Sequence, residues 1–119
     1  MKTSNRLSQA AENDIVEALA WSQSRFGEPA RRKYQTLISA AIRDIVADPS
    51  GMRARPRSEL GDGIYSWHLR ISRTGSTGRP VNRPRHLLVY RIDEGVVVIA
   101  RMLHDAIELE RHLDAAAWE

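Results

Sequence analysis

The sequence contains no cysteine, a single phenylalanine, and only two lysines among its eighteen basic residues. The absence of cysteine excludes disulfides, thiolate chemistry and cysteine-ligated zinc. No apolar run approaches the ~20 residues that a membrane-spanning helix needs. The first ten residues also lack the apolar core of a signal peptide. We therefore expect a soluble, cytoplasmic protein without a membrane segment.

The length of 119 residues predicts one domain, covering residues 1–119. A chain of this size can bury roughly two-thirds of its unfolded surface around one core, so it needs no covalent cross-link. We find no internal repeat and no low-complexity tract.

Charge is unevenly distributed along the chain, although the net charge is only +3. Residues 51–91 carry nine basic and two acidic side chains, whereas residues 92–119 carry two basic and seven acidic ones. Sixteen of the eighteen basic residues are arginine, whose planar fork suits carboxylates and phosphates. The middle segment therefore predicts an anionic partner, either nucleic acid or an acidic protein segment. A solvated basic surface is an equally weighted alternative.

The first half of the chain predicts a short edge strand at residues 5–9, followed by two helices. Ser8 can cap the first helix, which we expect to end at Gly27 in a left-handed cap. Pro29 suits the first turn of the second helix, and residues 48–51 stop it. Apolar or small residues recur with a period of 3.6: Ala11, Ile15, Ala18, Leu19, Ser22 and Phe26, then Tyr34, Leu37, Ile38, Ala41, Ile42, Ile45 and Val46. The short connection predicts an antiparallel helical hairpin.

The second half predicts three strands. Residues 64–72 alternate, with Tyr65, Trp67, Leu69 and Ile71 on the expected buried face. Residues 86–103 form two further runs around a glycine-bearing turn at 93–95, which indicates an antiparallel hairpin. The segments 51–63 and 73–84 are expected to be loops, the latter a mobile basic flap.

A final short helix is predicted from residue 105 onward. Asp105 and Glu108 form a capping-box pattern, and Leu109, Leu113 and Ala116 supply an apolar stripe. The expected order is β-α-α-β-β-β with a short C-terminal helix. Helices followed by strands favour an α+β fold, in which the helical hairpin packs on a small antiparallel sheet.

The candidate chemistry is limited. The four histidines match no zinc template, and the pair Glu108 and His112 is more typical of an exposed helix face than of a metal site. The segment 75–78 lacks the lysine of a phosphate-binding loop, and there is no Gly-x-Ser-x-Gly motif. We therefore expect neither a metal nor another cofactor.

Metal-independent RNA cleavage needs a base, an acid and cations near the phosphate. Such a site could be assembled from side chains on the predicted sheet: Tyr90, His86, Arg91, Arg101 and His104. The competing interpretation is structural. Simple alternation places Arg101 on the same face as Val97, Ile99 and Leu103, where an arginine usually pairs with a carboxylate. His104 would then be a junction residue whose ring bonds a backbone carbonyl.

Several segments resemble ParE-type toxins of the RelE/ParE superfamily, which belong to type II toxin–antitoxin systems. The resemblance rests on residues 7–8, 26–27, 84–91, 100–105 and 111–113, and it covers nearly all of residues 5–114. The segments Pro-Arg-His-Leu-Leu-Val-Tyr-Arg and Ala-Arg-Met-Leu-His-Asp are its most specific parts. Arg101, His104 and Asp105 thus form a structural signature of the family. The fold that the resemblance implies, two helices against a small antiparallel sheet, agrees with the expected order.

The resemblance implies a plasmid-stabilisation toxin that inhibits DNA gyrase and has no chemistry of its own. It also implies neutralisation by a cognate ParD-like antitoxin, a ribbon-helix-helix protein with an acidic and apolar C-terminal segment. In the resulting hetero-oligomer, DNA would be contacted only through the antitoxin. The basic middle segment fits such a partner, and the candidate antitoxin-binding residues are Arg70, Arg73, Arg79, Arg83, Arg85 and Arg91.

The alternative is a RelE-like, ribosome-dependent mRNA endoribonuclease. Its catalytic candidates would be Arg91, Arg101 and His104. The scarcity of lysine and the absence of any tyrosine after Tyr90 disfavour this branch. An inactive member that only stabilises its antitoxin on DNA is a third possibility.

Overall fold

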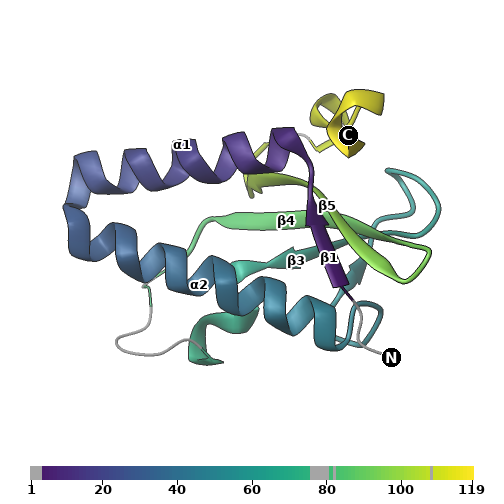
Figure 1. Cartoon of the computed structure of the whole chain (residues 1–119), viewed down its shortest axis with the longest axis horizontal. Coiled ribbons are helices and arrows are strands. Elements are labelled where there is room, and N and C mark those ends of the chain that lie inside the picture. The colour runs from purple at the N-terminus through teal and green to yellow at the C-terminus, as the bar shows by residue number, and fades with distance from the viewer. Residues whose placement is uncertain (1–3, 76–80, 82, 108) are drawn as a thin grey trace.

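The computed structural model describes residues 4–75, 81, 83–107 and 109–119 (Figure 1). Nothing is described of the rest, which includes Arg79, Glu108 and half of the flap expected at 73–84. The elements in chain order are β1 (Ser4–Leu7), α1 (Gln9–Phe26), α2 (Glu28–Ala47), β2 (Arg55–Pro56), β3 (Ile64–His68), the 3-10 helix η1 (Leu69–Gly75), β4 (His86–Asp93), β5 (Val96–His104), and the 3-10 helices η2 (Leu109–His112) and η3 (Ala115–Trp118). Across the described ranges, none of the helices is long and apolar enough to cross a membrane.

The helical hairpin begins and turns where the sequence predicts. The Ser8 hydroxyl accepts a 3.0 Å hydrogen bond from the Ala11 N–H and donates one of 2.6 Å to the Ala100 carbonyl. Gly27 separates the two helices with φ +91° and ψ 173°, and Pro29 lies in the first turn of α2. Gly27 therefore has the expected positive φ but not the left-handed helical ψ, because it is at once the end of α1 and the start of α2.

The five-stranded sheet has the order β1-β5-β4-β3-β2, and its strands are not all antiparallel. β1 pairs in parallel with β5, which lies beside it after the chain has passed through both helices and the three strands β2, β3 and β4. The other three pairs are antiparallel, as expected for β3 with β4 and for β4 with β5. The two-residue strand β2 was not predicted. It lies in the segment 51–63 that was expected to be a loop.

β4 and β5 form the predicted hairpin. Glu94 and Gly95 have φ values of +50° and +78°, the pair of positive φ angles found in a two-residue type I′ turn. This turn matches the right-handed twist of the flanking strands and so fixes their register.

A β-bulge interrupts the alternation of β5. Val89 pairs with Arg101 whereas Tyr90 pairs with Ile99, so Ala100 is the extra residue. The bulge moves Arg101 to the opposite face from Ile99. The expectation that Arg101 shares a face with Val97 and Ile99 is therefore wrong, although Leu103 does lie on the same face as Arg101.

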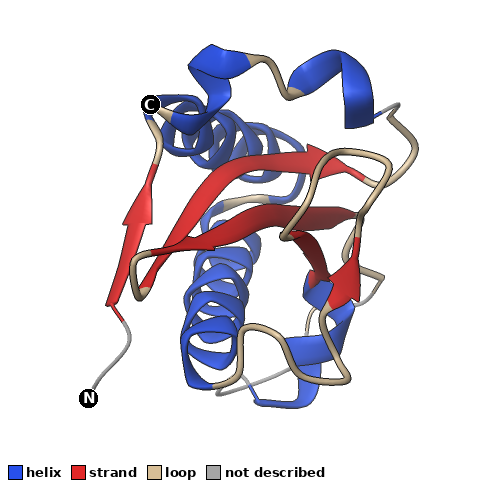
Figure 2. Cartoon of the chain, turned by 90° about the vertical axis from the view of Figure 1, so that its right-hand side faces the viewer, coloured by secondary structure: helices blue, strands red, loops and turns tan. Residues whose placement is uncertain are grey.

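The sheet is covered on both faces. On one face it packs against the two helices, with fully buried Trp67, Tyr90 and Ile99 in the contact (Figures 1 and 2). On the other face a smaller cluster joins Val89 and Leu103 to Leu109 of the C-terminal segment. This second layer explains why both faces of β3 contribute buried side chains.

Two predicted elements differ in the structure. β3 ends at His68, and the chain continues as η1 instead of extending the strand to residue 72. The described residues of the C-terminal segment form the two 3-10 helices η2 and η3, not an α-helix. Asp105 does not cap a helix, because its carboxylate contacts His68 and Arg85 instead.

Candidate functional site

A groove of about 1000 Å³ opens where the helical hairpin meets the ends of β4 and β5. Trp21 and Phe26 of α1 line it and remain 57% and 66% exposed, with their rings in edge contact at 5.7 Å. Phe26 continues the apolar stripe of α1, but it lies at the last residue of the helix and is not covered by the core. The groove is thus an extension of the helix–sheet core that no part of the described chain fills.

One wall of the groove is basic. Lys33 of α2 lines it together with Arg83 and Arg85, which precede β4. Arg83 has a φ of +54° and stands immediately before Pro84, a backbone conformation that costs on the order of 1–3 kcal/mol. Glu17 of α1 lies on the groove as well, so charges of both signs line it.

The groove also holds a hydrogen-bonded tyrosine–histidine pair. The Tyr34 hydroxyl lies 2.6 Å from His86 Nδ1, and the His86 ring meets the His104 ring edge-on at 5.7 Å. Burial, together with the nearby His104, lowers the pKa of His86 to about 4. Burial raises the pKa of Tyr34 to about 12. At neutral pH both side chains are therefore uncharged, and the His86 tautomer sets which of them donates the hydrogen bond.

Arg101 has the carboxylate partner that its sequence position predicts. Its Nε and Nη2 donate to the two oxygens of Asp14 at 2.7 and 2.8 Å, and Nη1 donates to the His112 carbonyl at 3.1 Å. The same Asp14 carboxylate accepts the Met102 N–H at 3.0 Å. The hydrogen bonds that Arg101 donates to Asp14 raise the pKa of its guanidinium. Asp14 thus joins α1 to the part of β5 that extends beyond its pairing with β1. Arg101 joins the C-terminal segment to both elements.

Asp105 joins three parts of the chain at the end of β5. It accepts from His68 Nε2 at 2.9 Å and pairs with Arg85 Nη2 at 3.1 Å. These contacts, first the hydrogen bond from His68, lower the pKa of the Asp105 carboxyl. His104 Nδ1 accepts the Ala106 N–H at 3.1 Å, so the ring bonds a backbone donor and not the carbonyl we expected.

The structure brings together only some of the predicted antitoxin-binding residues. Arg83 and Arg85 line the groove. Arg70 and Arg73 lie in η1, outside the groove lining. Arg91 lies on the other face of the sheet, with its guanidinium stacked 4.5 Å from the Trp118 ring centre. Arg79 is outside the described residues.

Of the proposed ribonuclease residues, His86, Arg101 and His104 line the groove, whereas Tyr90 and Arg91 do not. Arg91 pairs with Val98 in the sheet and His104 with His86, so the two side chains start ~20 Å apart along β5. Tyr90 is fully buried on the helix-covered face and donates to the Pro49 carbonyl at 2.6 Å. Only His86 and His104 of that set lie side by side.

Sequence reasoning did not assign several groove residues to a site, among them Asp14, Trp21, Lys33 and Tyr34. Trp21 lies just outside the apolar stripe of α1. A large aromatic residue at such a position indicates a second, exposed apolar surface. Tyr34 does pack against the core, as the helical period predicts, but its hydroxyl also reaches His86 in the groove. Within the described ranges, no three histidine or carboxylate side chains come together as metal ligands.

Comparison with known proteins identifies the family. A family model described as the ParE toxin of the type II toxin–antitoxin system parDE matches residues 6–109, so the chain belongs to the ParE toxin family. Among solved structures, the toxin–antitoxin complex RelBE2 from Mycobacterium tuberculosis contains a chain with the same fold, at a TM-score of 0.53 and 23% identity. The match covers 87% of this chain and 99% of that one. A search of curated proteins finds no significant match.

Proposed function

We propose that this chain is a toxin that inhibits DNA gyrase by binding it and has no catalytic activity of its own. The observation that carries the proposal is the family match over residues 6–109, since ParE-type toxins are expected to act on gyrase. The geometry supports a binding role. Arg101 is held by Asp14, and Arg91 lies far from His104, so the arginines and histidine of the ribonuclease hypothesis do not surround one phosphate.

We further propose that a ParD-like antitoxin neutralises the chain in a cytoplasmic hetero-oligomer, as part of a plasmid-stabilisation module. The groove suits the acidic and apolar segment of such an antitoxin. Trp21 and Phe26 offer exposed aromatic anchors, and Lys33 and Arg83 offer cations beside them. The RelBE2 structure, a toxin–antitoxin complex with the same fold, is consistent with this arrangement.

The gyrase proposal is tested by adding the purified chain to gyrase, ATP and relaxed plasmid. We expect loss of supercoiling and accumulation of gyrase-cleaved DNA. Expression without antitoxin should induce the DNA-damage response and filamentation. Immediate translation arrest with cleaved messenger RNA, and intact supercoiling in vitro, would contradict the proposal.

That opposite result would support the RelE-like ribonuclease. The observation in its favour is the cluster in the groove, where His86 and His104 meet beside Tyr34. In that case His104→Gln should abolish message cleavage while the folded fraction of the protein stays unchanged.

The antitoxin groove is tested with two variants that remove one charge each. Arg83→Gln removes a cation from the groove wall, whereas Arg91→Gln removes one from the opposite face of the sheet. We expect only Arg83→Gln to weaken the complex and to flatten its dependence on salt. Equal effects of the two variants would mean that net charge, and not the groove, attracts the antitoxin.

A further inference from the structure

The exposed side of α2 carries a run of basic residues, of which only Lys33 lines the groove. Residues 29–43 contain four basic side chains and no acidic one. The neighbouring helix α1 has the opposite character, with Glu12, Asp14 and Glu17 against a single Arg25. Asp44, the first carboxylate after this stretch, accepts a 2.7 Å hydrogen bond from Ser72 of η1. Within α2, the basic stretch is therefore offset by a single carboxylate, Glu28, which pairs with Arg32.

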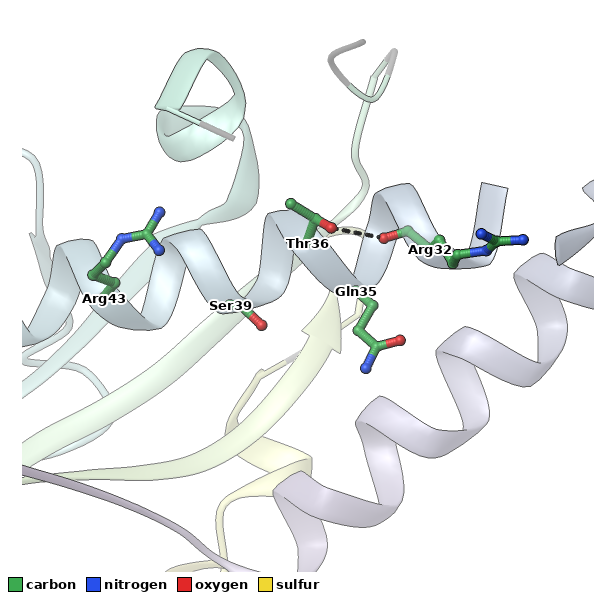
Figure 3. Close-up of a pocket in the computed structure, with 5 residues that line it drawn as sticks. All are labelled: Arg32, Gln35, Thr36, Ser39 and Arg43. Atoms are coloured by element: carbon green, nitrogen blue, oxygen red, sulfur yellow. Dashed lines mark hydrogen bonds between the residues drawn. The ribbon is translucent and has the colours of Figure 1, made fainter. Parts of the chain in front are cut away.

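A shallow hollow of about 370 Å³ lies along this side of α2 (Figure 3). Every side chain that lines it is polar or basic: Arg32, Gln35, Thr36, Ser39 and Arg43. Gln35, Ser39 and Arg43 follow at four-residue intervals, so they form one row along the helix. Figure 3 shows Arg32 and Arg43 at the two ends of the hollow, with Gln35 and Ser39 between them. At 1.5 Å per residue the two arginines start ~16 Å apart along the helix axis.

Most of these groups are available to a ligand. Arg32 pairs with Glu28 at 3.2 Å, but both side chains are more than 60% exposed, so this ion pair contributes little. Thr36 donates its hydroxyl to the Arg32 carbonyl. In the described part of the chain, Arg43 forms no ion pair with a carboxylate and Gln35 and Ser39 form no side-chain hydrogen bond.

We propose that this face of α2 binds duplex DNA. Arginine pairs with phosphate or guanine, glutamine with adenine, and serine or threonine with either phosphates or bases. An α-helix fits the major groove of B-DNA, which is about 12 Å wide, so terminal arginines ~16 Å apart reach the phosphates at its edges. The proposal adds a direct DNA contact to the contact expected through the antitoxin.

The chemistry of the hollow favours DNA over the other anionic partners. An acidic peptide would need apolar anchors to bind with useful affinity, and the hollow has none, whereas the groove has Trp21 and Phe26. Duplex RNA has a deep and narrow major groove that a helix cannot enter. The proposal does not rest on gyrase inhibition, because DNA binding is measured without gyrase.

The test measures binding of the purified full chain to a fluorescein-labelled 20-base-pair DNA duplex by fluorescence anisotropy between 50 and 300 mM salt. The variant R32Q/R43Q removes both ends of the hollow. The matched control R83Q/R85Q removes the same charge from the groove wall. Circular dichroism and thermal unfolding confirm that each variant is folded.

Each lost phosphate contact should reduce the slope of log affinity against log salt by about 0.9. We therefore expect R32Q/R43Q to bind about 60-fold more weakly at 0.1 M salt, with a slope reduced by about 2, and the control to keep the wild-type slope. Equal losses of DNA affinity in the two variants would show that net charge alone sets the affinity, which would overturn the proposal. It would also be overturned if a 20-base-pair RNA duplex or poly-glutamate bound the wild type as tightly as DNA, with the same loss in R32Q/R43Q.

Discussion

Replacing Asp14 with alanine tests whether one ion pair joins α1 to the sheet edge. The substitution removes the partner of Arg101, whose side chain is only 22% exposed, and leaves the Met102 N–H without its acceptor. Breaking a fully buried pair costs about 3–5 kcal/mol, and an unsatisfied backbone donor costs about 1–3 kcal/mol. Because both side chains keep some contact with water, we expect a total loss of about 2–3 kcal/mol. For a chain of this size this corresponds to a Tm about 10 °C lower.

Urea denaturation measures the interaction energy of this pair separately from the effect of each side chain. It compares the wild type with Asp14→Ala, Arg101→Met and the double variant. Asp14→Ala leaves Arg101 charged and unpaired, whereas the double variant removes both charges. The double variant should therefore be more stable than the sum of the single effects predicts, by at least about 1 kcal/mol. Strict additivity, or a loss below about 0.5 kcal/mol in Asp14→Ala, would refute the anchoring role.

Three other predictions concern pH, the turn and the groove. The pKa of His86 is about 4 in the folded chain and near 6.5 when unfolded, so below pH 6.5 the unfolded state binds more protons. Unfolding free energy should fall by about 1–2 kcal/mol between pH 7.5 and 5, and His86→Gln should remove most of that slope. Gly95→Ala forces a side chain into a φ of +78° and should lower stability by about 1 kcal/mol in urea titrations, whereas Glu94→Asn should not. Phe26→Ser should leave Tm within 2 °C, since the ring is 66% exposed, yet weaken antitoxin binding about tenfold or more by calorimetry; an unchanged affinity would exclude the ring as an anchor.

The sequence was informative wherever structure depends on local chemistry. The cap at Ser8, the break at Gly27 and Pro29, and the Glu94-Gly95 turn were all predicted, because each depends on the conformational preferences of one or two residues. The period of the apolar residues likewise gave both helices and the last two strands. The α+β class followed from their order.

The sequence was uninformative where distant residues compete with a local pattern. Asp105 has a helix-capping sequence around it, but His68 and Arg85 reach its carboxylate from elsewhere in the chain. Local reasoning cannot foresee such partners. The parallel pairing of β1 with β5 is hidden for the same reason, since it joins strands that are separated by most of the chain.

The candidate site was predicted in part. The arginine-rich segment pointed to Arg83 and Arg85, which do line the groove. It also pointed to Arg91, which the β4 register places on the opposite face. The apolar half of the groove was mistaken for core, because periodicity shows which side of a helix is apolar but not whether another layer covers it along its whole length.

The bulge at Ala100 acts as a change of phase within a single strand. Before it, alternate residues of β5 face the helices at odd positions, and after it at even positions, so Val97, Ile99 and Met102 all enter the same core. Deleting one residue here would restore regular alternation. Either Arg101 and the residues after it, or the residues before the deletion, would then face the opposite side of the sheet. In a sequence alignment, a gap placed one position away from the bulge would shift the correspondence of residues in the same way. It would assign the role of Arg101 to a residue that points the opposite way.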